Sequence, residues 1–176
     1  AITIKQPWAS LIVHGIKDIE NRTWPCPKKY LGQRVLIHSS TVPIEMINPN
    51  SVFTRQQWDS FSLGFQRKII CGEGYINSAI IGSVEIIDCV INHPSIWAEK
   101  TDTDNKGYYE NPIYNWVLAN PIQSNKPIEN VKGKLSFWDY PGIKEVKIEC
   151  PECGSIEIAI EDYTTAPFPT FLHSCN

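Results

Sequence analysis

The chain has 176 residues, of which 42% are hydrophobic and 20% are charged, and its formal net charge at pH 7 is -3. This length suits one compact domain with a small appendage. The negative charge argues against bulk electrostatic binding of long nucleic acids, so any phosphate contact must rest on a local patch. Three basic pairs are candidates, although solubility alone would also explain them: Lys28 with Lys29, Arg67 with Lys68, and Lys132 with Lys134.

The chain is expected to begin in a strand over Ile2–Ile4, which is followed by a short helix that begins near Pro7. Its apolar positions Trp8, Leu11 and Ile12 follow helical spacing, and Gly15 suits the left-handed residue that ends a helix. A strand follows, in which Glu20 and Arg22 lie on one face. Lys17 joins them only if the backbone turns directly after Gly15.

The later elements are mostly short and extended. We expect strands over 35–38, 79–91, 114–118 and 134–138, and one helix over 54–65. Thr54 and Gln57 form a capping-box pattern at the helix start, Gly82 indicates a bulge, and Asn120-Pro121 ends the third strand. The predicted fold class is mainly β with short helices (α+β), and the strand spacing favours a small closed β-barrel.

A motif near the start carries a family resemblance. The pattern Gly15-x-Lys17-x-x-Glu20-x-Arg22-x-Trp24, preceded by Gln6-Pro7-Trp8-Ala9, resembles the ASCH domain family of the PUA-like superfamily. Weaker similarity continues to about residue 140. The resemblance implies a PUA-like β-barrel over residues 1–142, with a cleft beside Gly15–Arg22. It also implies RNA or a modified nucleotide as the partner.

Aromatic and charged side chains suit the recognition of a base. A base can stack on tryptophan, and an arginine fork can bind phosphate or a base edge. The predicted ligand-binding residues are therefore Trp8, Lys17, Glu20, Arg22, Trp24 and His38. Trp8 could instead serve helix packing. His38 closes a buried strand, whose end could face the cleft.

An enzyme is the alternative function. Some small members of the family resemble amidohydrolases that act on acylated cytidine, and their lysine matches Lys17. This chain departs from their pattern at Glu20, where they have a threonine, and it has no position that matches their downstream catalytic glutamate. In this interpretation Lys17 would act as base or nucleophile, with Glu20 or Glu85 in proton transfer. A protein–protein adaptor is a further alternative.

The C-terminal segment 143–176 predicts a partial zinc ribbon. Cys150-Pro-x-Cys153-Gly is a zinc knuckle, residues 156–160 alternate as a strand, and Cys175 would begin a second knuckle. Either His173 completes a structural zinc site or the natural chain continues beyond residue 176. The ribbon could also bind a protein partner. The remaining cysteines lack metal spacing and indicate free thiols in a cytoplasmic protein: Cys26, Cys71 and Cys89. No membrane span or secretory leader is expected, and a start without Met suggests processing or trimming.

Overall fold

The computed structural model divides the chain into two compact units, Ala1–Trp138 and Asp139–Asn176. It describes residues 1–42, 49–71, 75–104, 107–109 and 111–141, and the backbone of 143–149 and 156–162. The first unit holds a five-stranded sheet with its helices, and the second holds a two-stranded sheet. Within the described residues, no helix is long and apolar enough to cross a membrane.

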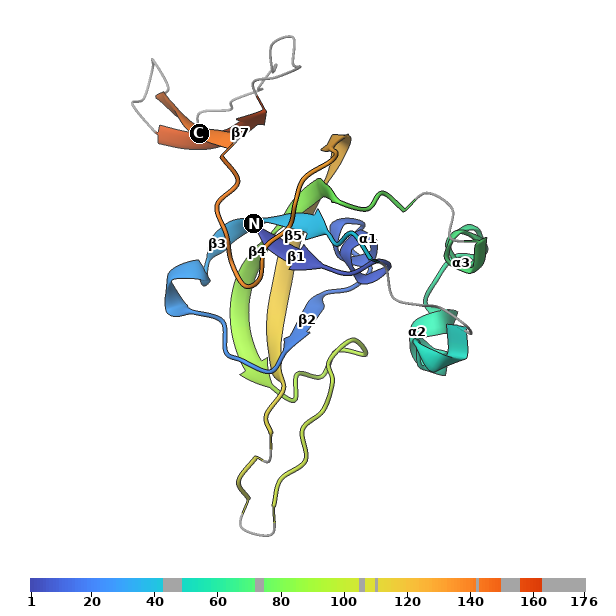
Figure 1. Cartoon of the computed structure of the whole chain (residues 1–176). Helices are drawn as coiled ribbons and strands as arrows, with labels where there is room; N and C mark the ends of the chain where they lie inside the picture. Colours follow the sequence, from blue (N-terminus) through green and yellow to red (C-terminus); the bar gives the residue numbers. More distant parts are fainter. Residues whose placement is uncertain are drawn as a thin grey trace, which may run out of the picture. The chain divides into compact units, whose positions relative to one another are not determined.

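The sheet of the first unit consists of β1 (Ile2–Ile4), β2 (Ile19–Arg22), β3 (Gln33–Ser39), β4 (Ala79–Ile91) and β5 (Tyr114–Ile128). Its strand order is β1-β3-β4-β5-β2, as Figure 1 shows. The β1–β3 pair is parallel and the other pairs are antiparallel. This architecture confirms the mainly β, α+β class.

The closed barrel predicted from the strand spacing is wrong for the described strands. The edge strands β1 and β2 have only three and four residues, and no ladder of backbone hydrogen bonds joins them. A side chain spans the gap instead, since Arg22 Nη2 donates to the backbone oxygen of Thr3 at 3.1 Å. The sheet is therefore open, with a seam between β1 and β2.

The two long strands are irregular. Their register shifts around Gly82, in agreement with the predicted bulge. The predicted end at Asn120-Pro121 is wrong, because β5 continues to Ile128. Asn120 has φ 48°, and pairing resumes at Ser83 with Ile122, so the two residues form a bulge without ending the strand. Segment 134–138 adds only an isolated bridge, between Ile2 and Phe137.

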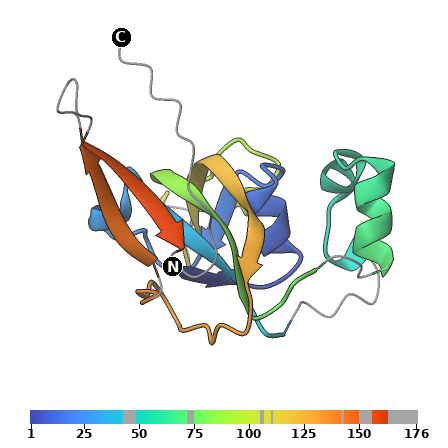
Figure 2. The ribbon, with the colours of Figure 1, turned by 90° about the horizontal axis from the view of Figure 1, so that it is seen from above.

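Three α-helices and two 3-10 turns accompany the sheet: α1 (Trp8–Val13), η1 (Lys28–Tyr30), η2 (Pro49–Ser51), α2 (Arg55–Asp59) and α3 (Leu63–Cys71). Figure 2 shows α1 between the sheet and the α2–α3 pair. The capping box of Thr54 and Gln57 is confirmed. The single helix predicted over 54–65 is wrong, because Ser60 Oγ donates to the Gln57 carbonyl and Ser62 Oγ caps α3, which separates two helices.

Two buried clusters meet at α1. One lies between α1 and the sheet and includes Ile37, Ile86 and Trp116. The other joins α1 to the α2–α3 pair through Leu11 and the aromatic side chains of Phe53, Phe61 and Trp97. Trp8, at the start of α1, packs against both clusters. Its ring is thereby fixed where the sheet side and the helical side adjoin.

The second unit contains an antiparallel hairpin. Strand β6 (Ile143–Glu149) pairs with β7 (Ile156–Asp162), and the innermost pair is Glu149 with Ile156. The strand predicted over 156–160 is confirmed. The predicted zinc ligands lie outside the described residues: Cys150, Cys153, His173 and Cys175.

Candidate functional site

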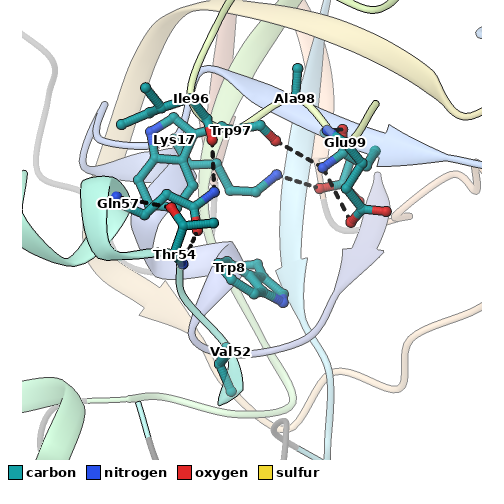
Figure 3. A pocket seen from close by; sticks show the side chains of 11 residues that line it. Trp8, Lys17, Val52, Thr54, Gln57, Ile96, Trp97, Ala98 and Glu99 are labelled. Atoms are coloured by element: carbon teal, nitrogen blue, oxygen red, sulfur yellow. Dashed lines mark hydrogen bonds and ion pairs between the residues drawn. The ribbon is translucent and has the colours of Figure 1, made fainter. Parts of the chain in front are cut away.

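A cavity of about 380 Å³ opens beside α1 in the first unit. Four segments line it: α1 with Trp8, the turn and strand with Lys17, Glu20 and Asn21, the segment with Val52, Thr54 and Gln57, and the segment Ile96–Glu99. In Figure 3 the Trp8 ring lies between Thr54 and Gln57 on one side and Glu99 on the other. The cavity therefore combines the half-buried ring of Trp8 with the charged groups of Lys17, Glu20 and Glu99.

The turn after α1 brings Lys17 to Glu20. Gly15 adopts φ +73°, and the backbone N–H groups of Ile16 and Lys17 both donate to the Leu11 carbonyl, at 2.9 and 3.1 Å. The chain thus reverses before β2 begins. Lys17 Nζ lies 3.4 Å from Glu20 Oε2. The sequence predicted this contact only if the backbone turns directly after Gly15, and it does.

Lys17 is a buried cation. Only 6% of its surface is exposed, and its Nζ also donates to the Ile19 carbonyl and lies 5.8 Å from the centre of the Trp8 ring. Burial lowers the pKa of Lys17, and the negative charges of Glu20 and Glu99 only partly offset this effect. The amine is consequently easier to deprotonate than an ordinary lysine.

Glu20 lies between two cations. Its second oxygen is 3.0 Å from Arg22 Nε, while the Arg22 guanidinium extends away from the cavity to Thr3 and lies 5.9 Å from the Trp116 ring. Arg22 is absent from the cavity lining. It therefore contacts the site only through Glu20.

Amide side chains hold the wall of the cavity. Asn21 Nδ2 donates to the Trp97 carbonyl at 2.9 Å, and the buried Asn115 donates both to Asn21 Oδ1 and to the Glu99 carbonyl. From the opposite side, Gln57 Nε2 donates to the Ile96 carbonyl at 2.8 Å. These bonds fix segment Ile96–Glu99 between β2 and α2.

Two other predicted ligand residues lie away from the cavity. Trp24 packs against Trp116 with ring centres 4.6 Å apart, in the core cluster next to the sheet. His38 is 1% exposed, and its Nε2 bonds the Val131 carbonyl at 2.9 Å beside Trp138. Both side chains serve packing of the first unit.

Glu85, the other candidate for proton transfer, also lies elsewhere. Its oxygens are 2.7 Å from Arg34 Nη2 and 2.7 Å from Asn120 Nδ2, and these contacts lower the pKa of its carboxyl, the bond from Asn120 most. Sequence reasoning missed Asn21, Gln57 and Glu99 as lining residues. The capping box located Thr54 and Gln57 at a helix start, but no pattern linked that start to Lys17.

The fold and the cavity define a mainly β, α+β domain with one cavity that is lined by aromatic and charged side chains. The chain belongs to the ASCH domain family, whose profile matches residues 2–128. This match confirms the family resemblance of the Gly15–Trp24 motif.

Two curated relatives are similar over most of the chain. Activating signal cointegrator 1 of Homo sapiens is 26% identical over 140 residues, which cover 76% of this chain and 22% of the relative. Activating signal cointegrator 1 of Mus musculus matches with the same identity and coverage. The chain thus spans about a fifth of the length of these relatives, at 22%.

Proposed function

We propose that the cavity binds one base of RNA or a modified nucleotide. The observation that supports this proposal best is the Trp8 ring beside the Lys17–Glu20 pair in one cavity of about 380 Å³. Ligand pockets commonly measure roughly 300–1,000 Å³, so the space suits a ligand of nucleoside size. The ASCH membership is consistent with such a role.

Each lining group has a task in this proposal. The Trp8 ring offers an apolar surface on which a planar base can stack. Lys17 supplies a donor, and Glu20 and Glu99 supply acceptors for the polar edge of the base. Arg22 keeps Glu20 oriented from behind, through the 3.0 Å contact.

Retention of a nucleoside tests this function. Total cellular RNA is digested to nucleosides and dialysed to equilibrium against the protein, and the retained nucleosides are identified by mass spectrometry. We expect wild type to enrich one nucleoside, and Lys17→Met to weaken its binding by about 1–3 kcal/mol because a direct contact to the base is lost. Lys68→Met, the same change on the exposed surface of α3, should bind like wild type.

The proposal has a clear contrary result. If wild type retains no nucleoside above the level of a protein blank, the cavity does not bind bases. Equal weakening in Lys17→Met and Lys68→Met would also contradict it, because only Lys17 lines the cavity.

Hydrolysis of an acylated base is a second candidate, favoured by the lowered pKa of Lys17 next to a carboxylate. A neutral Lys17 amine would take a proton from the water that attacks the amide carbonyl, and the departing amine would then be protonated. Incubation with N4-acetylcytidine, followed by chromatography, should then release cytidine and acetate with wild type and not with Lys17→Met. An unchanged substrate would exclude this activity for that compound.

We also propose a structural zinc ion bound by Cys150 and Cys153, with Cys175 and His173 as the further ligands. The proposal rests on the Cys-Pro-x-Cys-Gly spacing and on its position between the paired strands β6 and β7. Metal analysis of the purified chain is expected to give about one zinc per chain, reduced in Cys150→Ser with Cys153→Ser. Cys71→Ser, an exposed thiol outside this segment, is the control. A protein that stays zinc-free after refolding with zinc would contradict the site.

A further inference from the structure

A row of stacked aromatic rings joins two distant segments of the first unit. Tyr30 of η1 stacks on Phe137 with ring centres 3.7 Å apart, and Phe137 in turn stacks on Trp116 at 5.3 Å. Phe137 also forms the bridge to Ile2 of β1. The rings of Tyr30 and Phe137 are partly exposed, so the row reaches the surface.

Three cations lie beside aromatic rings of this row or beside the neighbouring ring of Trp138. Lys29 Nζ lies 4.8 Å from the centre of the Tyr30 ring, and Lys134 Nζ lies 6.0 Å from that of Trp138. Arg22 lies 5.9 Å from the Trp116 ring. We call Arg22, Lys29 and Lys134 the basic row. Within the described residues, neither Lys29 nor Lys134 forms an ion pair with a carboxylate, and both are exposed.

Direct contacts connect the basic row to the cavity. Glu20, which lines the cavity, contacts Arg22 at 3.0 Å, and Arg22 Nη2 donates to the Thr3 carbonyl at 3.1 Å. Thr3 Oγ1 then donates to the Lys134 carbonyl at 3.0 Å. The path follows the seam between β2 and β1, from the cavity to the backbone of Lys134.

We propose that the basic row binds the phosphates of a single-stranded RNA whose base occupies the cavity. This inference rests on the proposed function of the cavity. A net charge of -3 leaves phosphate binding to a local patch. Here the cations lie beside aromatic rings, and Arg22 contacts the cavity residue Glu20. Of the basic pairs in the sequence, Arg67 with Lys68 lies on α3, outside this row.

The inference is tested with a paired variant, Lys29→Gln with Lys134→Gln, which removes two charges and keeps polar side chains. Its matched control is Arg67→Gln with Lys68→Gln, which removes two charges from α3. The probe is a fluorescein-labelled octaribonucleotide of random sequence, measured by fluorescence anisotropy over a salt series. Nucleoside retention is measured on the same samples by the dialysis described above.

We expect the paired variant to lose about 10–30-fold in affinity for the probe at about 0.1 M salt, with a salt slope shallower by about 1.4. Its nucleoside retention should equal that of wild type, because no cavity residue changes. The α3 control should match wild type in both assays. Folding of each variant is checked by its thermal unfolding midpoint.

Other outcomes separate the two proposals. If the paired variant and wild type bind the probe with equal affinity and equal salt slope, the basic row does not bind phosphates. The proposal that the cavity binds a base is unaffected by this result. If the probe binds with normal salt dependence but no nucleoside is retained, the cavity does not bind a base. The proposal that one RNA occupies both the cavity and the basic row is then wrong as well. Displacement of the probe by polyglutamate as readily as by unlabelled RNA overturns RNA as the occupant and indicates an acidic protein.

Discussion

Replacing Gly82 with alanine is expected to lower the free energy of unfolding by about 3 kcal/mol, at the upper end for overpacked positions. An added Cβ at this position would lie 2.2 Å from the backbone oxygen of Ile122 and 2.8 Å from Val13 Cγ1. The first contact is with backbone in the paired strand β5, so it cannot be relieved by a rotamer change. Either the bulge in β4 must open or α1 must shift from the sheet.

The measurement is urea unfolding followed by tryptophan fluorescence, with Gly64→Ala as the control. Gly64 lies in α3, and an added Cβ there meets nothing within 4 Å. Alanine has a higher helix propensity by about 1 kcal/mol, so this variant should be slightly more stable than wild type. A Gly82→Ala protein as stable as wild type would show that the close approach of β4 and β5 is not needed.

The second large effect is expected from Glu20→Ala, which should cost about 3 kcal/mol at neutral pH, because it leaves a buried cation without its counter-charge. Lys17 is 6% exposed and Glu20 is 8% exposed, so water replaces little of the lost interaction. Arg22 loses the same carboxylate and stays near Lys17. The positive charge of Arg22 would then act on Lys17 without the carboxylate between them.

The stability deficit of Glu20→Ala is expected to depend on pH in a definite direction. Burial lowers the pKa of Lys17 in the folded protein below 10.5, and removing Glu20 lowers it further. The unfolded chain then binds more protons than the folded one below pH 10.5, so the stability of the variant rises with pH. Because the pKa of Lys17 is lower in the folded variant than in folded wild type, the stability of the variant rises more with pH. Its stability deficit relative to wild type should therefore shrink as pH rises toward 10.5. A deficit independent of pH would contradict this account.

Lys17→Met is the matched control for Glu20→Ala. Methionine fills similar volume without charge, and Glu20 keeps its 3.0 Å contact to Arg22. This variant should lose less stability than Glu20→Ala while it loses nucleoside binding. Urea unfolding at several pH values and the dialysis assay together separate the structural role of the pair from its binding role.

The start of the chain was the most predictable part of the site. Helical spacing and Gly15 located α1 and the turn, because both depend on neighbouring residues. The same local reasoning showed that a turn directly after Gly15 would bring Lys17 to Glu20. Arg22 was misplaced for a nonlocal reason, since its guanidinium is drawn to the Thr3 carbonyl of the other edge strand. His38 likewise lies at a strand end whose surroundings depend on segment 131–138.

Long-range pairing explains the errors in the sheet. Regular strand spacing indicates how many strands exist, but sheet closure depends on whether β1 and β2 are long enough to pair. Asn120-Pro121 resembles a strand end locally, yet hydrogen bonds from β4 resume at Ile122. Contacts of Asn21 and Asn115 hold the lining residues Trp97 and Glu99 beside the cavity, and sequence spacing does not reveal these contacts.

The wall segment Ile96–Glu99 is held to its neighbours by the carboxamides of Asn21, Gln57 and Asn115. Carboxamides do not ionise in the physiological range, whereas the Lys17 amine in the cavity has a pKa that burial lowers. The bonds that hold the shape of the cavity therefore do not depend on the ionised group inside it. Loss of the Lys17 proton would change the charge of the cavity and leave the position of its wall unchanged.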